Sequence, residues 1–221
     1  MQRHFSPPGF DSSILDFSIG CFGGICRDRL AGPLVAFSMA WPDLNVGVHE
    51  MGFAELPGGV ASGRLALALR PGAGVEGFAS VELWPDRAVV AMAPDHPLAA
   101  APDITIDQLA DAVLLVSRDR AREQLHRFLI DRLFPKVAAP ATRIVADARR
   151  SQLLARVAAG EGLALLCESQ VDAAMAQLAV RPVTGDAAQF RVRALWLEAR
   201  RDAPLSTLIE QLEQSREGWF V

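Results

Sequence analysis

Residues 151–169, with the sequence SQLLARVAAGEGLALLCES, constrain the fold of this chain more than any other segment. Leucine, valine and alanine recur at helical spacing in the first half, and Gly160 and Gly162 are typical of a helix end. The run at 163–166 is apolar throughout, as in a strand that helices cover on both faces. The segment therefore predicts a helix and a buried strand, which together make half of a parallel α/β unit.

A strand of this kind also points to a place for a ligand. In α/β sheets, ligands bind where strands end and helices begin, because exposed backbone N–H groups gather at that edge. The residues directly after Leu166, beginning with Cys167, are therefore candidates for ligand contact.

The same alternation of strand and helix continues through most of the chain, which predicts an α/β fold. Pro57, Gly58 and Gly59 weaken the segment around Leu56 as a helix. The two β-rich runs at 79–83 and 88–93 are so close that they indicate either antiparallel pairing or one extended crossover. Two α/β units joined near 88–93 and 192–198 predict two lobes with a cleft between them. We expect strands at 14–19, 44–48, 65–69, 79–83, 88–93, 113–116, 142–145, 163–166, 180–183 and 192–197, and helices near 30–41, 106–110, 121–134, 151–158 and 205–212.

The bulk composition excludes several classes of protein. The chain has 221 residues and a formal net charge of -4, so it lacks the concentrated basic surface that general nucleic-acid binding requires. There is no apolar run of about 18 residues, as a membrane span would need. The first residues carry no basic start followed by an apolar stretch, so we expect a cytoplasmic protein and interpret 1–13 as a leader or linker.

Four fragments, in order along the chain, resemble the effector-binding domain of LysR-type transcriptional regulators. They are LVAFSMAWPDLNV at 34–46, GRLALAL at 63–69, LWPDRAVVAMAPDHPLA at 83–99 and VAAGEGLALL at 157–166. The resemblance implies two Rossmann-like subdomains joined by two crossover strands, like a periplasmic solute-binding protein, with a small effector in the cleft. Subdomain I then comprises 14–91 and 194–221, and subdomain II comprises 92–193.

The resemblance also implies partners. Such regulators form antiparallel dimers, with the helix at 33–41 and the second strand against the helix near 122–133 of the neighbouring subunit. We therefore expect a homodimer or higher homo-oligomer. Such regulators contact DNA through a winged helix-turn-helix that precedes this domain and is absent from this sequence, so we expect no other contact with DNA. Relatives often carry proline at the position of Cys167 and an acidic residue at the position of Ala66.

In the first lobe, the loop between the first strand and first helix is a candidate ligand site. Its backbone N–H groups could receive an anionic group, although an ordinary glycine turn is the alternative, and the resemblance favours binding. Phe53 follows the second strand and is either a wall of the pocket or a core residue. Arg70 follows the third strand, where it either pairs with an anionic effector or is a solvated residue before a turn. The loop candidates are Cys21, Phe22, Gly23, Gly24 and Ile25.

In the second lobe, Ser117 and Arg118 end a strand, and Asp147 lies between a strand and a helix. The resemblance places these positions at the cleft. We favour binding for Ser117 and a helix N-cap for Asp147. Cys167 is the remaining ligand candidate, at the end of the strand described first.

The cysteines permit a different function. Cys21, Cys26 and Cys167 could form a thiol sensor or a metal site, because thiolates are soft ligands and strong nucleophiles. Buried cysteine is more often a small hydrophobic residue, so we expect no metal and no cofactor.

Catalysis has little support, since no GxSxG elbow, phosphate-binding loop or paired-histidine motif is present. The prediction is therefore an effector-sensing domain for a small, anionic metabolite. A solute-binding protein of a transporter is the first alternative, and an enzyme that uses the cleft is the second.

Overall fold

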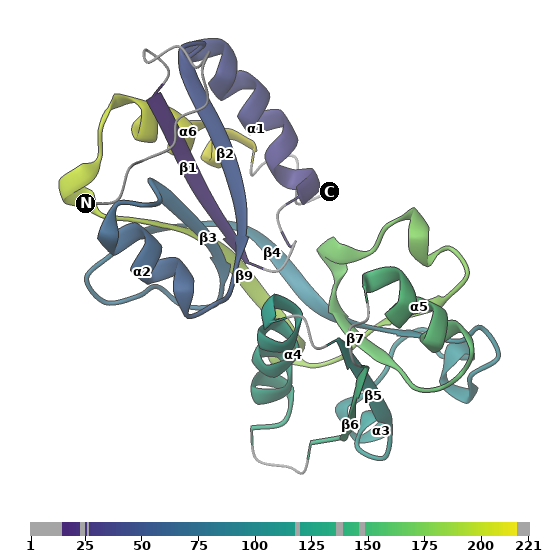
Figure 1. The fold of residues 1–221 in the computed structure, drawn as a ribbon. Helices are drawn as coiled ribbons and strands as arrows, with labels where there is room; N and C mark the ends of the chain where they lie inside the picture. Colours follow the sequence, from purple (N-terminus) through teal and green to yellow (C-terminus); the bar gives the residue numbers. More distant parts are fainter. Residues whose placement is uncertain are drawn as a thin grey trace, which may run out of the picture.

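Two lobes connected by two long strands make up the protein (Figure 1). The structure is a computed structural model that describes residues 15–22, 25, 27–117, 120–135, 139–145 and 149–215. The predicted leader at 1–13 lies outside these residues. Within them, no helix is long and apolar enough to cross a membrane.

The first lobe is built on three parallel strands. β1 (Leu15–Phe22) lies between β2 (Leu44–Met51) and β3 (Leu67–Pro71), and runs parallel to both. The helices α1 (Arg27–Ala40) and α6 (Ala203–Gln214) pack against each other. The third helix, α2 (Glu55–Ser62), packs on β1 and β3. This arrangement confirms the predicted order of strands and helices in the first lobe.

Residues 55–62 form the α-helix α2, although Pro57, Gly58 and Gly59 make the sequence pattern weak for a helix here. Pro57 lies in its first turn, where a backbone N–H has no partner within the helix in any case, so the proline costs little. Leu56 and Val60 are buried under the helix. A Cβ at Gly59 would lie 2.6 Å from Cδ1 of Leu65, so this glycine permits close packing on the segment that leads into β3.

Two strands cross between the lobes. β4 (Ala79–Met92) is one continuous strand with a register shift between Glu82 and Trp84, so the two runs predicted at 79–83 and 88–93 belong to one extended crossover. It pairs antiparallel with β9 (Gln189–Trp196), which pairs antiparallel with β3. Trp84, at the shift, is fully buried.

The second lobe has a smaller sheet. β5 (Val113–Ser117) is parallel to β6 (Ala141–Val145), whereas β7 (Ala164–Cys167) and β8 (Ala179–Pro182) are antiparallel to β4. Its helices are α3 (Ile106–Leu109), α4 (Arg120–Leu133) and α5 (Arg150–Ala158). Short 3-10 helices lie at Pro97–Ala100, Glu168–Gln170, Ala173–Met175, Asp186–Ala188 and Glu198–Arg200.

The segment 151–169 forms the predicted helix and strand, α5 and β7. The strand part of this segment has neighbours in both directions. Leu163 makes a parallel bridge to Leu114 of β5, and β7 itself lies antiparallel to β4. Gly160 has a φ of 74°, which is the left-handed conformation typical of a helix end. Gly162 has another role: a Cβ there would lie 2.6 Å from the backbone oxygen of Val113.

We expect Gly162→Ala to lower the free energy of unfolding by about 1–3 kcal/mol, because the added methyl group must push α5 and β7 away from β5. Urea unfolding monitored by circular dichroism measures this change. Gly58→Ala is the matched control, since Gly58 is exposed in α2 and a Cβ there meets nothing within 4 Å. That variant should be neutral or more stable by up to about 1 kcal/mol. Equal stabilities of the two variants would contradict the close approach at Gly162.

Candidate functional site

The second lobe touches the first through the helix α4, in a group of four phenylalanines. The ring centroid of Phe128 on α4 lies 5.7 Å from Phe53, 6.5 Å from Phe22 and 5.4 Å from Phe190. Phe22 and Phe53 stand at the ends of β1 and β2, and Phe190 is on β9. These four residues, here called the interlobe aromatic cluster, bring the carboxyl ends of the first-lobe strands against α4.

Gln124 extends the same contact by one helical turn. A Cβ at Gly52 would lie 2.7 Å from Oε1 of Gln124, so the amide end of this side chain lies directly against the residue that follows β2. This Oε1 atom is buried and has no hydrogen-bond partner in the described part of the chain. A buried acceptor without a partner is uncommon and indicates a position where a ligand or water completes the hydrogen bonding.

Arg70 lies beside the interlobe aromatic cluster. Its guanidinium carbon is 3.8 Å from the centroid of the Phe53 ring, and the residue is only 8% exposed. Among the described residues no carboxylate forms an ion pair with it, and its Nε atom has no hydrogen-bond partner. Burial lowers the pKa of Arg70, because removing the cation from water is unfavourable. The site therefore holds a desolvated positive charge that lacks a counter-ion.

Asp86 forms a second polar group on β4, at the junction of the lobes. Its carboxylate accepts hydrogen bonds from the Ser169 hydroxyl at 2.6 Å and from the backbone N–H of Arg87 at 2.8 Å. Burial raises the pKa of Asp86 despite these bonds. The contact ties the crossover strand to the residues that follow β7.

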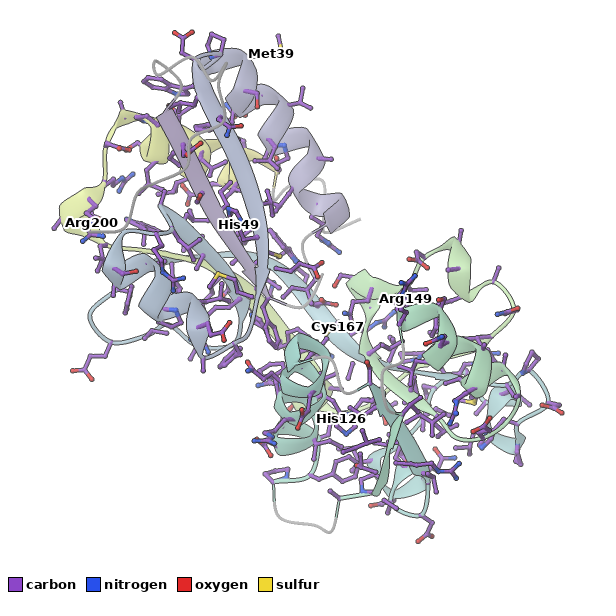
Figure 2. All side chains as sticks on the ribbon, viewed as in Figure 1. Met39, His49, His126, Arg149, Cys167 and Arg200 are labelled. Atoms are coloured by element: carbon purple, nitrogen blue, oxygen red, sulfur yellow. The ribbon has the colours of Figure 1, made fainter. Side chains whose placement is uncertain are left out.

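Cys167 is adjacent to this carboxyl group and lies at the junction of the two lobes (Figure 2). It is fully buried, and burial together with the charge of Asp86 raises the pKa of its thiol. A reactive thiol needs the opposite shift, because the thiolate is the nucleophile. Cys21 is also buried, and Cys26 lies outside the described residues. Within the described residues, no three His, Cys, Asp or Glu side chains are grouped to hold a metal ion.

Ser117 lies in a small cavity of about 40 Å³ inside the second lobe, where His126 of α4 and Arg150 of α5 also line the wall. Ser117 is 2% exposed. The Nε2 atom of His126 is buried without a hydrogen-bond partner among the described residues, and burial lowers the pKa of His126 to about 4. This histidine is neutral at physiological pH.

The structure separates the candidate ligand residues into groups. Phe53 and Arg70 are in contact with each other, whereas Ser117 and Cys167 belong to the second lobe. Cys21, Phe22 and Ile25 are buried in the core of the first lobe. Four candidates lie outside the described residues: Gly23, Gly24, Arg118 and Asp147.

Sequence reasoning missed the contribution of α4. Gln124 and Phe128 are four residues apart and therefore share one face of the helix. The sequence shows this spacing, but the spacing alone does not show that this face turns toward the other lobe. The predicted ligand residues lie at or after the ends of strands, whereas Gln124 and Phe128 lie within a helix.

Two lobes with parallel strand ends facing each other, and two strands crossing between them, define a two-lobed ligand-binding domain. The model of the LysR substrate binding domain family matches residues 16–217. The chain therefore belongs to this family, whose members are the effector-binding domains of LysR-type transcription regulators, with a fold like that of periplasmic binding proteins.

Solved structures of LysR regulators share this fold. Full-length BenM is 21% identical, with a TM-score of 0.77, over 95% of this chain and 70% of that chain. The C-terminal domain of a probable LysR regulator from Rhodococcus sp. RHA1 is 21% identical, with a TM-score of 0.72, over 89% of this chain and 98% of that one. The reduced form of the OxyR regulatory domain from Pseudomonas aeruginosa is 19% identical, with a TM-score of 0.70, over 93% and 98% of the two chains. No curated protein sequence matches this chain closely enough to count as a relative.

The buried His126 makes an acid-dependent contribution to stability. Its pKa of about 4 in the folded protein lies below the ordinary histidine value of 6.5, so the unfolded chain takes up the proton first as the pH falls. The contribution is present above pH 6.5 and is lost between about pH 6.5 and pH 4, by up to about 3 kcal/mol. We expect His126→Gln to remove this part of the pH dependence in urea unfolding.

The exposed His49 provides the matched control, and His49→Gln should unfold with the acid sensitivity of the wild type. A His126→Gln variant that loses as much stability as the wild type between pH 6.5 and pH 4 would show that His126 is not responsible.

Proposed function

We propose that this domain senses a small organic anion whose negative group pairs with Arg70 between the two lobes. The observation that carries this proposal is the buried guanidinium of Arg70, which has no carboxylate partner among the described residues. A desolvated charge is costly unless a counter-charge meets it, and an effector carboxylate supplies one. Arginine suits this role, because its planar fork binds a carboxylate through two hydrogen bonds.

The interlobe aromatic cluster supports an effector with an apolar body. Phe53 is in contact with both Arg70 and Phe128, so a ligand at this point meets aromatic rings beside a positive charge. The effector-binding domain of BenM was solved with its effector benzoate, an aromatic carboxylate, and is 19% identical to this chain with a TM-score of 0.72 over 92% of it and 94% of that chain. Benzoate is therefore a suitable probe of the site.

The effector acts by favouring one arrangement of the lobes. Arg70 belongs to β3 of the first lobe, and Gln124 and Phe128 belong to α4 of the second. A ligand held by both lobes shifts their arrangement only as far as its affinity for the two arrangements differs. We assign 14–91 and 194–221 to subdomain I and 92–193 to subdomain II, so that the lobes meet within β4 and β9.

The DNA-binding function belongs to a helix-turn-helix domain outside this sequence, and the regulator acts in the cytoplasm. The cleft binds its effector without chemical turnover. A transporter's solute-binding protein is the alternative, and the gene region upstream of Met1 distinguishes the two: a helix-turn-helix indicates the regulator and a signal peptide the transporter.

We expect benzoate to raise the melting temperature of the wild-type domain more than benzamide does, because only benzoate carries the charge that Arg70 needs. Arg70→Gln should weaken benzoate binding by about 10-fold or more, in line with the loss of a charge-assisted hydrogen bond. Calorimetric titration measures the affinities.

Arg64→Gln is the control for this experiment, since Arg64 is exposed just before the same strand. Acetate and succinate extend the test to carboxylates without a ring. If no carboxylate stabilises the wild type more than benzamide does, or if the Arg64 and Arg70 variants bind equally, Arg70 is not the anion ligand.

A dimer that uses α1 and β2 agrees with the exposed apolar side chains on these elements. Val35 and Met39 of α1 are 62% and 79% exposed, and Val48 of β2 is 44% exposed. Met39 stands at the outer end of α1 (Figure 2). Apolar residues exposed together on neighbouring elements are typical of an interface between subunits.

We expect Met39→Glu to weaken dimer formation by about 10-fold or more, because it places a charge in the apolar centre of this contact. Sedimentation equilibrium measures the dissociation constant. Gln214→Glu, on the exposed end of α6, is the matched control and should dimerise as the wild type does. A wild type that stays monomeric at high concentration contradicts the proposed dimer.

A further inference from the structure

A second cavity lies outside the contact between Arg70 and Phe53. It has a volume of about 330 Å³ and is formed where the end of α4 meets the start of β9, the middle of β4 and the turn after β3. A volume of this size accommodates a small metabolite. The residues that line it are Gly72, Ala73, Pro85, Arg132, Gln189, Phe190, Arg191 and Arg193.

The cavity wall has a strong excess of positive charge. Three of its side chains are the guanidinium groups of Arg132, Arg191 and Arg193. The carboxylate of Glu82 pairs with both Arg191, at 3.4 Å, and Arg193, at 2.7 Å. Among the described residues no carboxylate forms an ion pair with Arg132. Among the described residues, the cavity wall therefore carries more cations than carboxylates, and Arg132 is the guanidinium without an acidic partner.

The strand register concentrates this charge further. Arg193 on β9 lies directly opposite Arg70 on β3, and Glu82 lies opposite Arg193 on its other side. Side chains that face each other across antiparallel strands are on the same side of the sheet, and like charges in this position are destabilising. Glu82 compensates Arg193 in this arrangement, whereas Arg70 has no carboxylate partner among the described residues.

Arg132 is held in position to bind such an anion. One Nη2 hydrogen bond goes to the backbone oxygen of Gln189, and the guanidinium lies 5.9 Å from the centroid of the Phe190 ring. Its Nε atom is buried and has no partner among the described residues. The side chain is thus fixed at one end while a donor is left for a ligand.

We propose that this cavity binds a small oxyanion with two negative charges, either a phosphate group or a dicarboxylate. Arginine forks bind the oxygen pairs of both groups, and Pro85 and Phe190 provide an apolar wall for the organic part of the ligand. This site is separate from the effector site at Arg70 and goes beyond the function proposed above.

Occupation of this cavity affects the effector site through α4. Arg132 lies one helical turn after Phe128, and Phe128 packs on Phe53. The guanidinium of Arg70 lies over the same Phe53 ring. An anion that binds Arg132 together with Arg191 and Arg193 holds α4 against the crossover strands. The dianion and benzoate are then coupled, and each changes the affinity for the other by the same factor.

Calorimetric titration of the whole chain tests the site, with inorganic phosphate and succinate as dianions and acetate as the monoanion, all at one ionic strength. We expect at least one dianion to bind about 10-fold or more tightly than acetate. Arg132→Gln should lose that preference. Glu82→Gln should bind the dianion several-fold more tightly, because it removes the carboxylate that pairs with Arg191 and Arg193, and a misfolded variant would not show such a gain.

Arg127→Gln is the matched control, because Arg127 is on the same helix and its side chain is 72% exposed and pairs with Glu123. Preference for phosphate over succinate assigns a phosphate site, and the reverse assigns a dicarboxylate site. The proposal is overturned if neither dianion binds more tightly than acetate, or if Arg127→Gln and Arg132→Gln bind equally. It is also overturned if Arg70→Gln abolishes dianion binding while Arg132→Gln preserves it, since the dianion would then occupy the effector site.

Discussion

The packing of Phe128 against Phe22, Phe53 and Phe190 is the interaction on which the arrangement of the two lobes depends. It joins the helix α4 of the second lobe to the ends of β1 and β2 in the first lobe and to the crossover strand β9. Aromatic contacts of this kind contribute both burial and a preferred ring geometry. Because the four rings meet where β1 and β2 end, the same packing that holds the lobes together also forms the wall of the proposed ligand site. Stability and sensing therefore depend on one set of contacts.

Uncompensated positive charge is the second constraint, and it is placed around this packing rather than on the outer surface. The chain as a whole has a formal net charge of -4. Even so, Arg70 is buried on Phe53 without a carboxylate partner among the described residues. Arg132 lies beside Phe190, also without a carboxylate partner among these residues, and its Nε atom is buried. Arginine remains charged in such surroundings because its pKa starts so high, and it cannot relieve the cost of burial by losing a proton as lysine can. Anions that bind here replace water as the partner of these guanidinium groups, and their affinity depends on how α4 lies against β3 and β9.

The order of strands and helices could be predicted from the sequence because local periodicity sets it. Leu163 to Leu166, for instance, is apolar on both faces, and Gly160 marks the helix end before it. Arg70 could be named as a candidate for ligand contact, beside the alternative of a solvated residue, because strand ends meet at one edge of the sheet. Gly162 is required because the backbone oxygen of Val113 lies so close to it. Arg193 lies opposite Arg70 because of the antiparallel register between two strands that are far apart in the sequence. Contacts of this kind leave no periodic pattern in the sequence, so the cavity lined by Arg132, Arg191 and Arg193 could be found only in the folded chain.

Cys167 shows how burial changes the meaning of a residue. At the end of a strand in a ligand-binding domain, a thiol suggests a reactive group. In the folded chain it is fully buried, and Asp86 lies near enough to raise its pKa further. Asp86 accepts hydrogen bonds from Ser169, two residues after the cysteine, so a small side chain at 167 lets the end of β7 approach the crossover strand. The thiol then acts as a small apolar residue at the junction of the lobes, and the chemistry of the domain belongs to its arginines.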